Sequence, residues 1–476
     1  MSNYDPKTAI NQEEHGNPFE TLQEGIDYLM QQAKAKQYQA QVNAISTISG
    51  TTRFAVNQVT QHTDLNNISF QLKLIKGKQQ ASASSTQLGE IGYKALFEQV
   101  ESNLLKSPEI PFLQGLPQPR AGSNADLTGK DWIMEDRAEA IVSAVNTAEE
   151  MTDEIRLAGT ASANTTYYRV VSTEGIDVQT SSNYNYFKVN AITGPADGRG
   201  YGQEELYWRF DQPDIESMAE EATQTAIDTV ESKLLTKDAG DYEVVLGPQA
   251  VSDLMVYIMF GADAVGFHES NSYTSDRLGD QIFDDKLTIR DMPRDPHEAI
   301  AARTFDAEGI ATKNRDFYEN GVLKFIPYSS FFASKYLDDK DGATGHVIGP
   351  EFGWYGGGAM PVSSSITPGD RTTEEQLAEV EDGLYVKNFW YNRFTKRREG
   401  GLTGLTRNGL YHVKDGEIQG AVRNLRYTES FVKAFGQGNI ISISSDRRKF
   451  FMSHVPSIHL ENYHFSSVAH TKQQLE

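Results

Sequence analysis

The sequence predicts an α+β fold with two domains, on the basis of three observations. Helical and β-type segments occur without the regular strand–helix–strand alternation of a doubly wound parallel sheet. The chain has 476 residues, more than one domain usually contains. From Gly383 onward nearly every segment is β-like. We therefore expect a flexible tail over residues 1–17, an N-terminal domain of layered helices and antiparallel strands over 18–235, and an antiparallel β-rich domain over 240–476.

The first part of the N-terminal domain is predicted to contain a helix, several strands and a second helix. Apolar residues recur at helical spacing in the two helical segments, and apolar and polar residues alternate in the clearest strand. Gly50 and the two threonines that follow it suggest a hairpin turn between two short strands. The expected elements are a helix over 18–40, strands over 42–49, 53–60, 68–75 and 80–86, and a helix over 89–106.

The second part of the N-terminal domain has the same order of elements. Its last helix is expected to begin at a cap formed by Asp214 or Ser217 and to run to Lys233. The repeated order is consistent with a duplicated unit, although no residue-level period is visible. The expected elements are a helix over 137–146, strands over 155–160, 166–172, 175–186 and 187–192, and the capped helix.

The beginning of the C-terminal domain holds the segments of most functional interest. Residues 241–246 are predicted to form a buried strand, Gly247 and Pro248 interrupt it, and 249–260 has helical periodicity. Further on, Asn320-Gly321 separates two β-prone runs. This is the strongest short-range hairpin signal, because a type I′ turn needs positive φ at both central residues. A helix is expected over 329–337.

Composition and charge disfavour several classes of function. There are 44 basic and 66 acidic residues, and the formal charge of −22 disfavours binding to nucleic acid. Cysteine is absent, so no disulfide, thiolate nucleophile or cysteine-ligated metal is expected. No run of about 18 apolar residues predicts a membrane helix, and the first residues lack the pattern of a signal peptide. We therefore expect a cytoplasmic protein with no membrane or nucleic-acid partner.

Several short phrases occur in an order that is typical of one family. Taken together, and with the Gly-Leu-Pro-x-Pro connector at 115–119, they resemble the TldD/PmbA family of peptidases, whose members are also named modulators of DNA gyrase. The resemblance covers nearly the whole chain beyond the tail. The phrases are Val244-Val245-Leu246, Arg277-Leu278-Gly279-Asp280, Leu287-Thr288-Ile289, Phe305-Asp306-Ala307-Glu308-Gly309, Asn320-Gly321-Val322-Leu323 and Gly383-Leu384-Tyr385-Val386.

The resemblance implies a zinc site that this chain has lost. TldD-like members carry His-Glu-x-x-x-His on the helix after the Val-Val-Leu strand and a later Cys, and zinc there activates a water molecule. Here Pro248 stands in place of the first His, Gln249 in place of the Glu and Asp253 in place of the second His. Proline has no ligand atom and a glutamine amide is not a base near neutral pH. This departure resembles the PmbA (TldE)-like branch, the zinc-free companion of a zinc-bearing subunit.

The resemblance also implies a function. The chain would be the subunit without a cofactor in a TldD/TldE-type metalloprotease system that degrades or processes unfolded peptides, with zinc held by a TldD-like partner. A peptide could be bound by adding a strand to a sheet edge. The alternative is a self-sufficient metallopeptidase or other hydrolase with unrecognised ligands, acting as a homodimer. Whether the chain is itself an enzyme stays open, and a purely structural β-rich protein is a third hypothesis.

Six residues of the family signature are expected to be structural or to line a groove. Asp306 and Glu308 could form a catalytic pair, but a turn that satisfies backbone amides explains their spacing equally well, and we favour the turn. The six residues are Asp306, Glu308, Gly309, Thr312, Asn320 and Gly321.

Histidines are the remaining candidate metal ligands. His268 precedes a glutamate, but neither position where a second histidine would be needed carries one. Four more histidines lie near the C-terminus without carboxylates at ligand spacing, so a metal site is not favoured there. These are His454, His459, His464 and His470.

Two basic triplets stand out in this acidic chain, at 396–398 and 447–449. We expect both to be solvated loop charges. Contact with the acidic surface of a partner is the alternative.

Overall fold

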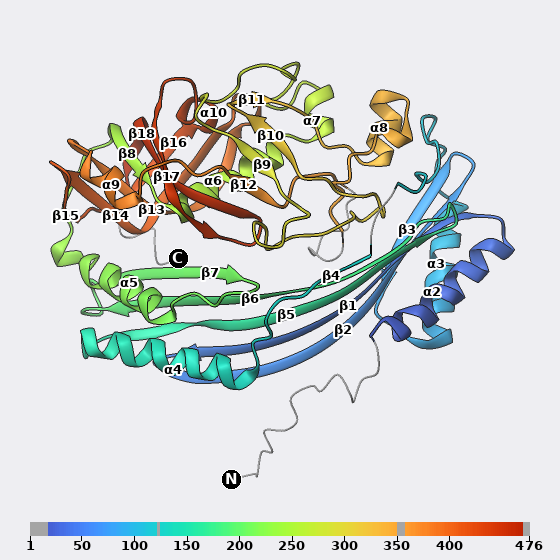
Figure 1. Cartoon of the computed structure of the whole chain (residues 1–476), viewed down its shortest axis with the longest axis horizontal. Helices are drawn as coiled ribbons and strands as arrows, with labels where there is room; N and C mark the ends of the chain where they lie inside the picture. The colour runs from blue at the N-terminus through green and yellow to red at the C-terminus, as the bar shows by residue number, and fades with distance from the viewer. Residues whose placement is uncertain (1–17, 121–123, 350–357, 470–476) are drawn as a thin grey trace, which may run out of the picture.

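The computed structural model describes residues 18–120, 124–349 and 358–469, so the predicted tail over 1–17 lies outside the described residues. Two sheets organise the described chain, and Figure 1 shows the C-terminal elements lying above the long strands of the N-terminal sheet. Both sheets are largely antiparallel and helices pack against them, which confirms the α+β prediction. The domain limits at 235 and 240 stay a prediction.

Seven strands form the N-terminal sheet, in the order β3-β2-β1-β5-β6-β4, with β7 also paired with β6. All of its pairs are antiparallel except β4 with β6. Two strands of 17 residues, β1 and β5, pair along nearly their whole length at its centre. The strands are β1 (Gln39–Ala55), β2 (Gln58–Lys76), β3 (Gln79–Ser85), β4 (Ala125–Leu127), β5 (Arg156–Ser172), β6 (Asp177–Thr193) and β7 (Gly200–Trp208).

Four helices pack on this sheet in two pairs, near opposite ends of the long strands (Figure 1). The first pair, α2 (Pro18–Ala35) and α3 (Gly89–Leu104), buries apolar side chains against β1 and β2. The second pair, α4 (Met134–Met151) and α5 (Ile215–Asp228), does the same against β5 and β6. The order helix, three strands, helix therefore occurs twice, around β1–β3 and around β5–β7.

The predicted hairpin at 50–52 is wrong. Strand β1 continues through Gly50, which pairs with Asp64 on β2 and Ala163 on β5, and the chain turns only at Val56 and Asn57. Gly50 is needed for close packing rather than for a turn, because a Cβ there would lie 2.6 Å from the guanidinium of Arg137.

Other N-terminal boundaries also differ from the prediction. The four short strands expected between 155 and 192 are the two continuous strands β5 and β6. Asp214 caps α5 by accepting the backbone N–H of Ser217, as predicted, but the helix ends at Asp228 rather than at Lys233. A separate 3-10 turn, η2 (Glu231–Lys233), follows it.

Eleven strands form the C-terminal sheet, in the order β11-β10-β9-β12-β18-β16-β14-β13-β8. An additional pairing of β18 with β8 closes five of them into a ring, while β15 pairs with β14 and β17 with β18. The strands are β8 (Gly240–Leu246), β9 (Ile289–Asp291), β10 (Arg315–Glu319), β11 (Val322–Leu323), β12 (Ser364–Ile366), β13 (Asp382–Lys396), β14 (Gly401–Lys414), β15 (Glu417–Ala421), β16 (Leu425–Ser430), β17 (Ile440–Lys449) and β18 (Ser453–Val468).

The helices of this domain are short except for α6, which packs on β13 and β18 and contributes to the largest apolar core. The predicted Asn-Gly hairpin is confirmed, since Glu319 pairs with Val322 across the turn. The predicted helix after it is also confirmed, with Ser329 as its N-cap. The helices are α6 (Pro248–Gly261), α7 (Ala264–His268), α8 (Ser330–Leu337), α9 (Thr373–Ala378) and α10 (Phe431–Ala434), with 3-10 turns η3 (Lys340–Gly342) and η5 (Arg397–Glu399).

Candidate functional site: the helix after strand β8

The helix α6 occupies the place where the resemblance puts a zinc helix. Strand β8 ends in fully buried Val244, Val245 and Leu246. Gly247 is the N-cap and Pro248 opens the helix, a position where the missing N–H of proline costs nothing. Buried side chains on one side of α6, such as Leu254, then fix the helix in the core.

The N-terminal end of this helix is held by hydrogen bonds to the side chain of Asp253. The amide of Gln249 donates to Asp253 Oδ1 at 3.2 Å, and the backbone N–H of Phe389 on β13 donates to Asp253 Oδ2 at 3.0 Å. Burial raises the pKa of Asp253 to about 7, and these two hydrogen bonds offset only part of that effect. Asp253 therefore ties α6 to the neighbouring strand, and both of its oxygens are engaged.

These residues do not fit a zinc ion. Pro248 offers no donor atom, the amide nitrogen of Gln249 is already used as a donor, and Asp253 is a single carboxylate bound to backbone and amide. In the described residues, 18–120, 124–349 and 358–469, no three His, Asp or Glu side chains lie together in a group that could hold a metal ion.

A polar group of the N-terminal sheet acts electrostatically on Asp253. Lys188 on β6 and Glu205 on β7 form an ion pair at 3.2 Å, and Tyr186 donates to the same Glu205 oxygen at 2.8 Å. The charge of Glu205 raises the pKa of Asp253 further, while Lys188 lowers it. Burial, and then Glu205, also raise the pKa of Tyr186. Charged side chains of the other domain therefore contribute to the electrostatic environment of Asp253.

Asp306 and Glu308 organise the backbone of the signature loop. Asp306 Oδ1 accepts the N–H groups of Glu308 and Ile310, and Oδ2 accepts that of Val347 at 2.9 Å. Burial, followed by the nearby charge of Glu308, raises the pKa of Asp306 to about 7. Glu308 accepts the backbone N–H and the hydroxyl of Ser330 at the start of α8.

The same loop joins the two domains. The carbonyl of Ala307 accepts hydrogen bonds from the side chains of Gln41 and Asn43 on β1. Gly309 has a φ of +73°, and a Cβ there would lie 2.4 Å from Ile176 of the N-terminal domain. The Phe305 ring stacks on Tyr168 of β5. The signature loop is thus placed at an interdomain contact.

The remaining signature residues support the backbone. Thr312 donates from its hydroxyl to the carbonyl of Arg303 at 2.7 Å. Asn320 and Gly321 both have positive φ, and Asn320 exchanges hydrogen bonds with the hydroxyl of Thr288. A Cβ at position 321 would lie 2.1 Å from the carbonyl oxygen of Phe283, so only glycine fits.

The candidate histidines each contact a polar or aromatic side chain, except that His470 lies outside the described residues. His268 stacks on Tyr336, and its Nε2 lies 2.7 Å from the hydroxyl of Tyr328. His459 is paired with Glu243 at 2.8 Å and His464 with Asp241 at 2.8 Å.

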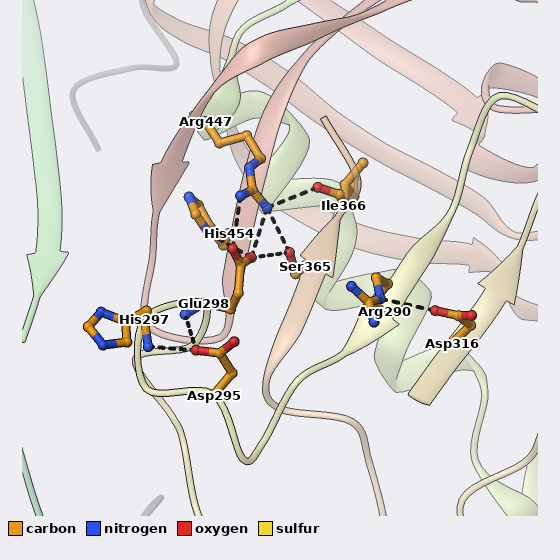
Figure 2. A network of polar contacts seen from close by, with 9 residues as sticks. All are labelled: Arg290, Asp295, His297, Glu298, Asp316, Ser365, Ile366, Arg447 and His454. Carbon is orange, nitrogen blue, oxygen red and sulfur yellow. Dashed lines mark hydrogen bonds and ion pairs between the residues drawn. The ribbon is translucent and has the colours of Figure 1, made fainter. Parts of the chain in front are cut away.

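His454 belongs to the polar network drawn in Figure 2. Glu298 lies at its centre, accepting hydrogen bonds from Ser365 and Arg447 and lying 3.2 Å from His454 Nδ1. Burial, followed by the charge of Arg447, lowers the pKa of His454 to about 4. Arg290, opposite Ser365 on the next strand, pairs with Asp316. Because Glu298 is directly bound to Arg447, this group is a salt-bridged contact rather than a hydrolytic triad.

The expectation of solvated loop charges at 447–449 is wrong. These residues end strand β17, and none of them is exposed. Arg447 forms two hydrogen bonds with the carboxylate of Glu298. In the other triplet, Arg397 pairs with Asp263, while Lys396 is exposed.

Arg448 belongs to an interdomain charge cluster that the sequence reasoning missed. Arg448 and Lys387 of the C-terminal domain meet Glu204 on β7 and Glu221 on α5. Lys387 Nζ lies 2.8 Å from Glu204 Oε1, while its hydrogen bond goes to Thr225. Burial lowers the pKa of Lys387, but the two carboxylates outweigh it and the net shift is upward. Nothing in sequence spacing indicates this group, because its members lie on four separate elements.

The comparisons with known proteins agree with this fold. Models described as the PmbA/TldA metallopeptidase central domain and C-terminal domain match residues 133–230 and 239–467. The fold and these two matches thus define a metallopeptidase-like protein. The chain belongs to the PmbA/TldD family.

Individual relatives match parts of the chain at low sequence identity. A protein named metalloprotease from Methanothermobacter thermautotrophicus is 20% identical, covering 69% of this chain and 73% of its own length. Metalloprotease PmbA of Escherichia coli O157:H7 is 25% identical over 43% of this chain and 41% of its own length. An uncharacterized protein of Methanocaldococcus jannaschii is 27% identical over 56% of this chain. The chain spans 59% of that last relative's length, less than two thirds.

Solved structures share the fold across nearly the whole chain. TldE from Thermococcus kodakarensis has a TM-score of 0.81 at 16% identity and covers 95% of this chain and 100% of its own. A Thermotoga maritima protein described as a candidate modulator of a DNA gyrase has a TM-score of 0.79 at 20% identity, covering 94% and 100%. In the described part of the chain, none of the helices has the length and apolar character needed to cross a membrane.

Proposed function

We propose that this chain is the zinc-free, PmbA (TldE)-like subunit of a TldD/TldE-type metalloprotease that degrades or processes unfolded peptides. The observation that carries the proposal is the hydrogen bonding of Asp253 to Phe389 and Gln249. At the position of a zinc ligand, this carboxylate stabilises the contact between α6 and β13. The chain itself needs no cofactor, and zinc is held by a TldD-like partner.

Three features support a partner-dependent role over independent catalysis. The three positions that would carry ligands and a general base hold Pro248, Gln249 and Asp253, of which only one ionises near neutral pH. The structural similarity to TldE spans 95% of the chain. The carboxylates of the signature, Asp306 and Glu308, are bound to backbone amides and a serine, so they are not free for proton transfer.

The partner is tested by recovery from the native host. The tagged chain is expressed at its natural level, isolated under native conditions and its co-purifying proteins are identified by mass spectrometry. We expect a TldD-like protein that carries the His-Glu-x-x-x-His motif. The reconstituted pair should cleave an unfolded peptide in a chelator-sensitive manner, while the chain alone should not.

Metal analysis of the purified chain separates this proposal from the alternative of a self-sufficient hydrolase. We expect far less than one zinc per chain. About one zinc per chain, with chelator-sensitive cleavage by the chain alone, would instead support a homodimeric peptidase with ligands outside α6.

A further inference from the structure

A cavity of about 570 Å³ lies where the two domains meet. One wall is the β6–β7 turn with Arg199 and the start of β7 with Tyr201, and η2 lies next to it. The opposite wall comes from β13 and β14, including Trp390 and Arg407. Its volume is in the range of small-molecule binding sites. No step of the proposed function uses it.

Irregular strand pairing creates this cavity. On the side of β14 away from β13, β14 pairs with β16 over residues 401–405 and with β15 over 411–414, and neither strand pairs with the segment between these ladders. Residues 422–424 cross the gap, with Thr406 donating to Asn424. On β13 the register shifts between Trp390 and Arg393, and Tyr391 has a φ of +59°. Such bulges turn side chains out of the regular sheet pattern.

Arg407 lines this cavity and has no carboxylate partner within the described residues. Its guanidinium lies 4.3 Å from the centre of the Trp390 ring, and burial lowers its pKa. The neighbouring Arg423, in contrast, forms an ion pair with Glu231. Stacking occupies the flat face of a guanidinium and leaves the N–H donors in its plane available.

The chemistry of the walls defines the ligand. The planar N–H donors of Arg407 match the two oxygens of a carboxylate. Leu234, Leu405 and Val422 provide apolar surface next to that cation, together with the Trp390 ring. A ligand that fills the cavity should therefore carry a carboxylate and an apolar group on a short scaffold.

We propose that this cavity binds the C-terminal residue of a peptide, with the α-carboxylate on Arg407 and an apolar side chain against Trp390 and Leu405. This assignment rests on the proposed function, because that function supplies peptides as ligands. The assignment goes beyond the proposed function by naming the end of the peptide that is recognised and a binding site separate from α6. The cavity would hold the end of a substrate or product peptide while the partner acts elsewhere on it.

The test compares two peptides on the purified chain. An N-acetylated tripeptide that ends in leucine is titrated calorimetrically, first as the free acid and then as the C-terminal amide. We expect the free acid to bind at least tenfold more tightly, the change expected for loss of a charged hydrogen-bonded pair. Equal affinities, or no binding of the free acid, would overturn the proposal.

Matched variants locate the effect. Arg407→Gln should lower the affinity for the free-acid peptide at least tenfold and leave the affinity for the amide peptide unchanged. Arg393→Gln is the control, because Arg393 stacks on Tyr391 in the same way, 4.0 Å from the ring centre, but does not line the cavity. It should bind the free acid within about twofold of wild type. An equal loss in both variants, with unchanged unfolding temperatures, would place binding outside the cavity and contradict the proposal.

Inorganic phosphate serves as a third probe. If phosphate binds through Arg407 and the peptide acid does not, the cavity is an anion site without peptide recognition and the proposal fails. The binding test needs no partner subunit, so its failure is distinguishable from failure to recover a TldD-like protein.

Discussion

The carboxylate of Asp253 accepts the backbone N–H of Phe389 at 3.0 Å, which joins the first turns of α6 to strand β13. One residue further along β13, Trp390 lines the interdomain cavity. The same strand carries Lys387, two residues before Phe389, into the charge cluster with Glu204. A single strand therefore connects the first turns of α6, the cavity and the domain contact.

Asp253→Asn should flatten the pH dependence of stability. The pKa of Asp253 is raised from 3.8 to about 7, so the folded chain binds more protons than the unfolded chain between about pH 4 and pH 7. The stabilisation from this protonation is present at low pH and is lost as pH rises through 7. The variant should therefore gain about 2 kcal/mol relative to wild type at pH 8, with little gain at pH 4.

Thermal unfolding of both proteins across this pH range checks the prediction. Asp285→Asn, at an exposed position, is the control and should leave the profile unchanged. Parallel profiles for Asp253→Asn and wild type would contradict a buried, uncharged carboxyl at this position.

Lys387→Met should destabilise the contact between the domains. Removal of the ammonium leaves buried Glu204 and partly exposed Glu221 with Arg448 as their remaining cation, which should cost about 3 kcal/mol. Adding Glu204→Gln should recover part of this loss, because the excess buried charge is then removed. Thermal unfolding and limited proteolysis measure the effect.

The exposed pair of Lys324 and Glu319, at 2.8 Å, provides the matched control. Lys324→Met should cost less than about 1 kcal/mol. Equal losses of unfolding free energy in the two variants would mean that burial of the cluster does not add to the stability of the chain.

Asp306→Asn should destabilise the chain by about 2 kcal/mol. Both oxygens of Asp306 accept hydrogen bonds from backbone N–H groups, and the asparagine NH₂ group would place donors against one of those N–H groups. The variant should lower the unfolding temperature without changing any peptide affinity at the cavity. Asp295→Asn is the control, since Asp295 also accepts backbone N–H groups but is less buried. A stable Asp306→Asn chain would argue against a backbone role for this residue.

Restoring the family motif should not restore a working zinc site. The triple substitution Pro248→His, Gln249→Glu and Asp253→His supplies two ligands and a base, but positions five apart on a helix point about 140° away from each other. Without a third ligand we expect weak zinc binding and no peptidase activity, as measured by metal content after dialysis and by peptide cleavage.

A fourth substitution tests where the missing ligand belongs. The hydroxyl of Ser453 on β18 lies 2.9 Å from that of Ser252 on α6, and position 252 points between positions 248 and 253 around the helix. Adding Ser453→Cys should therefore raise the zinc content above that of the triple variant. Tight zinc binding and turnover in the triple variant alone would show that the chain already holds a third ligand, and would contradict the zinc-free assignment. The candidates for that ligand are His454, His459 and His464.

Local signals were sufficient for many elements of the fold. The helical periodicity of α2 and α6, the Asn320-Gly321 turn and the Asp214 cap each depend on contacts within a few residues, and all appear in the structure. Gly50 was misread as a turn because a glycine needed for close packing has the same local pattern as one needed for a turn.

The sequence by itself determined the α+β class and the residue types Pro248, Gln249 and Asp253 at the start of α6, because these follow from residue type and short-range spacing. Only the tertiary structure decided that Asp253 binds Phe389, that Arg448 meets Glu204, and that Trp390 and Arg407 form a cavity wall. Those contacts join segments distant in sequence or shifted by strand bulges. Which residues meet in these contacts depends on how the strands and the two sheets pack, and no local sequence pattern specifies that packing.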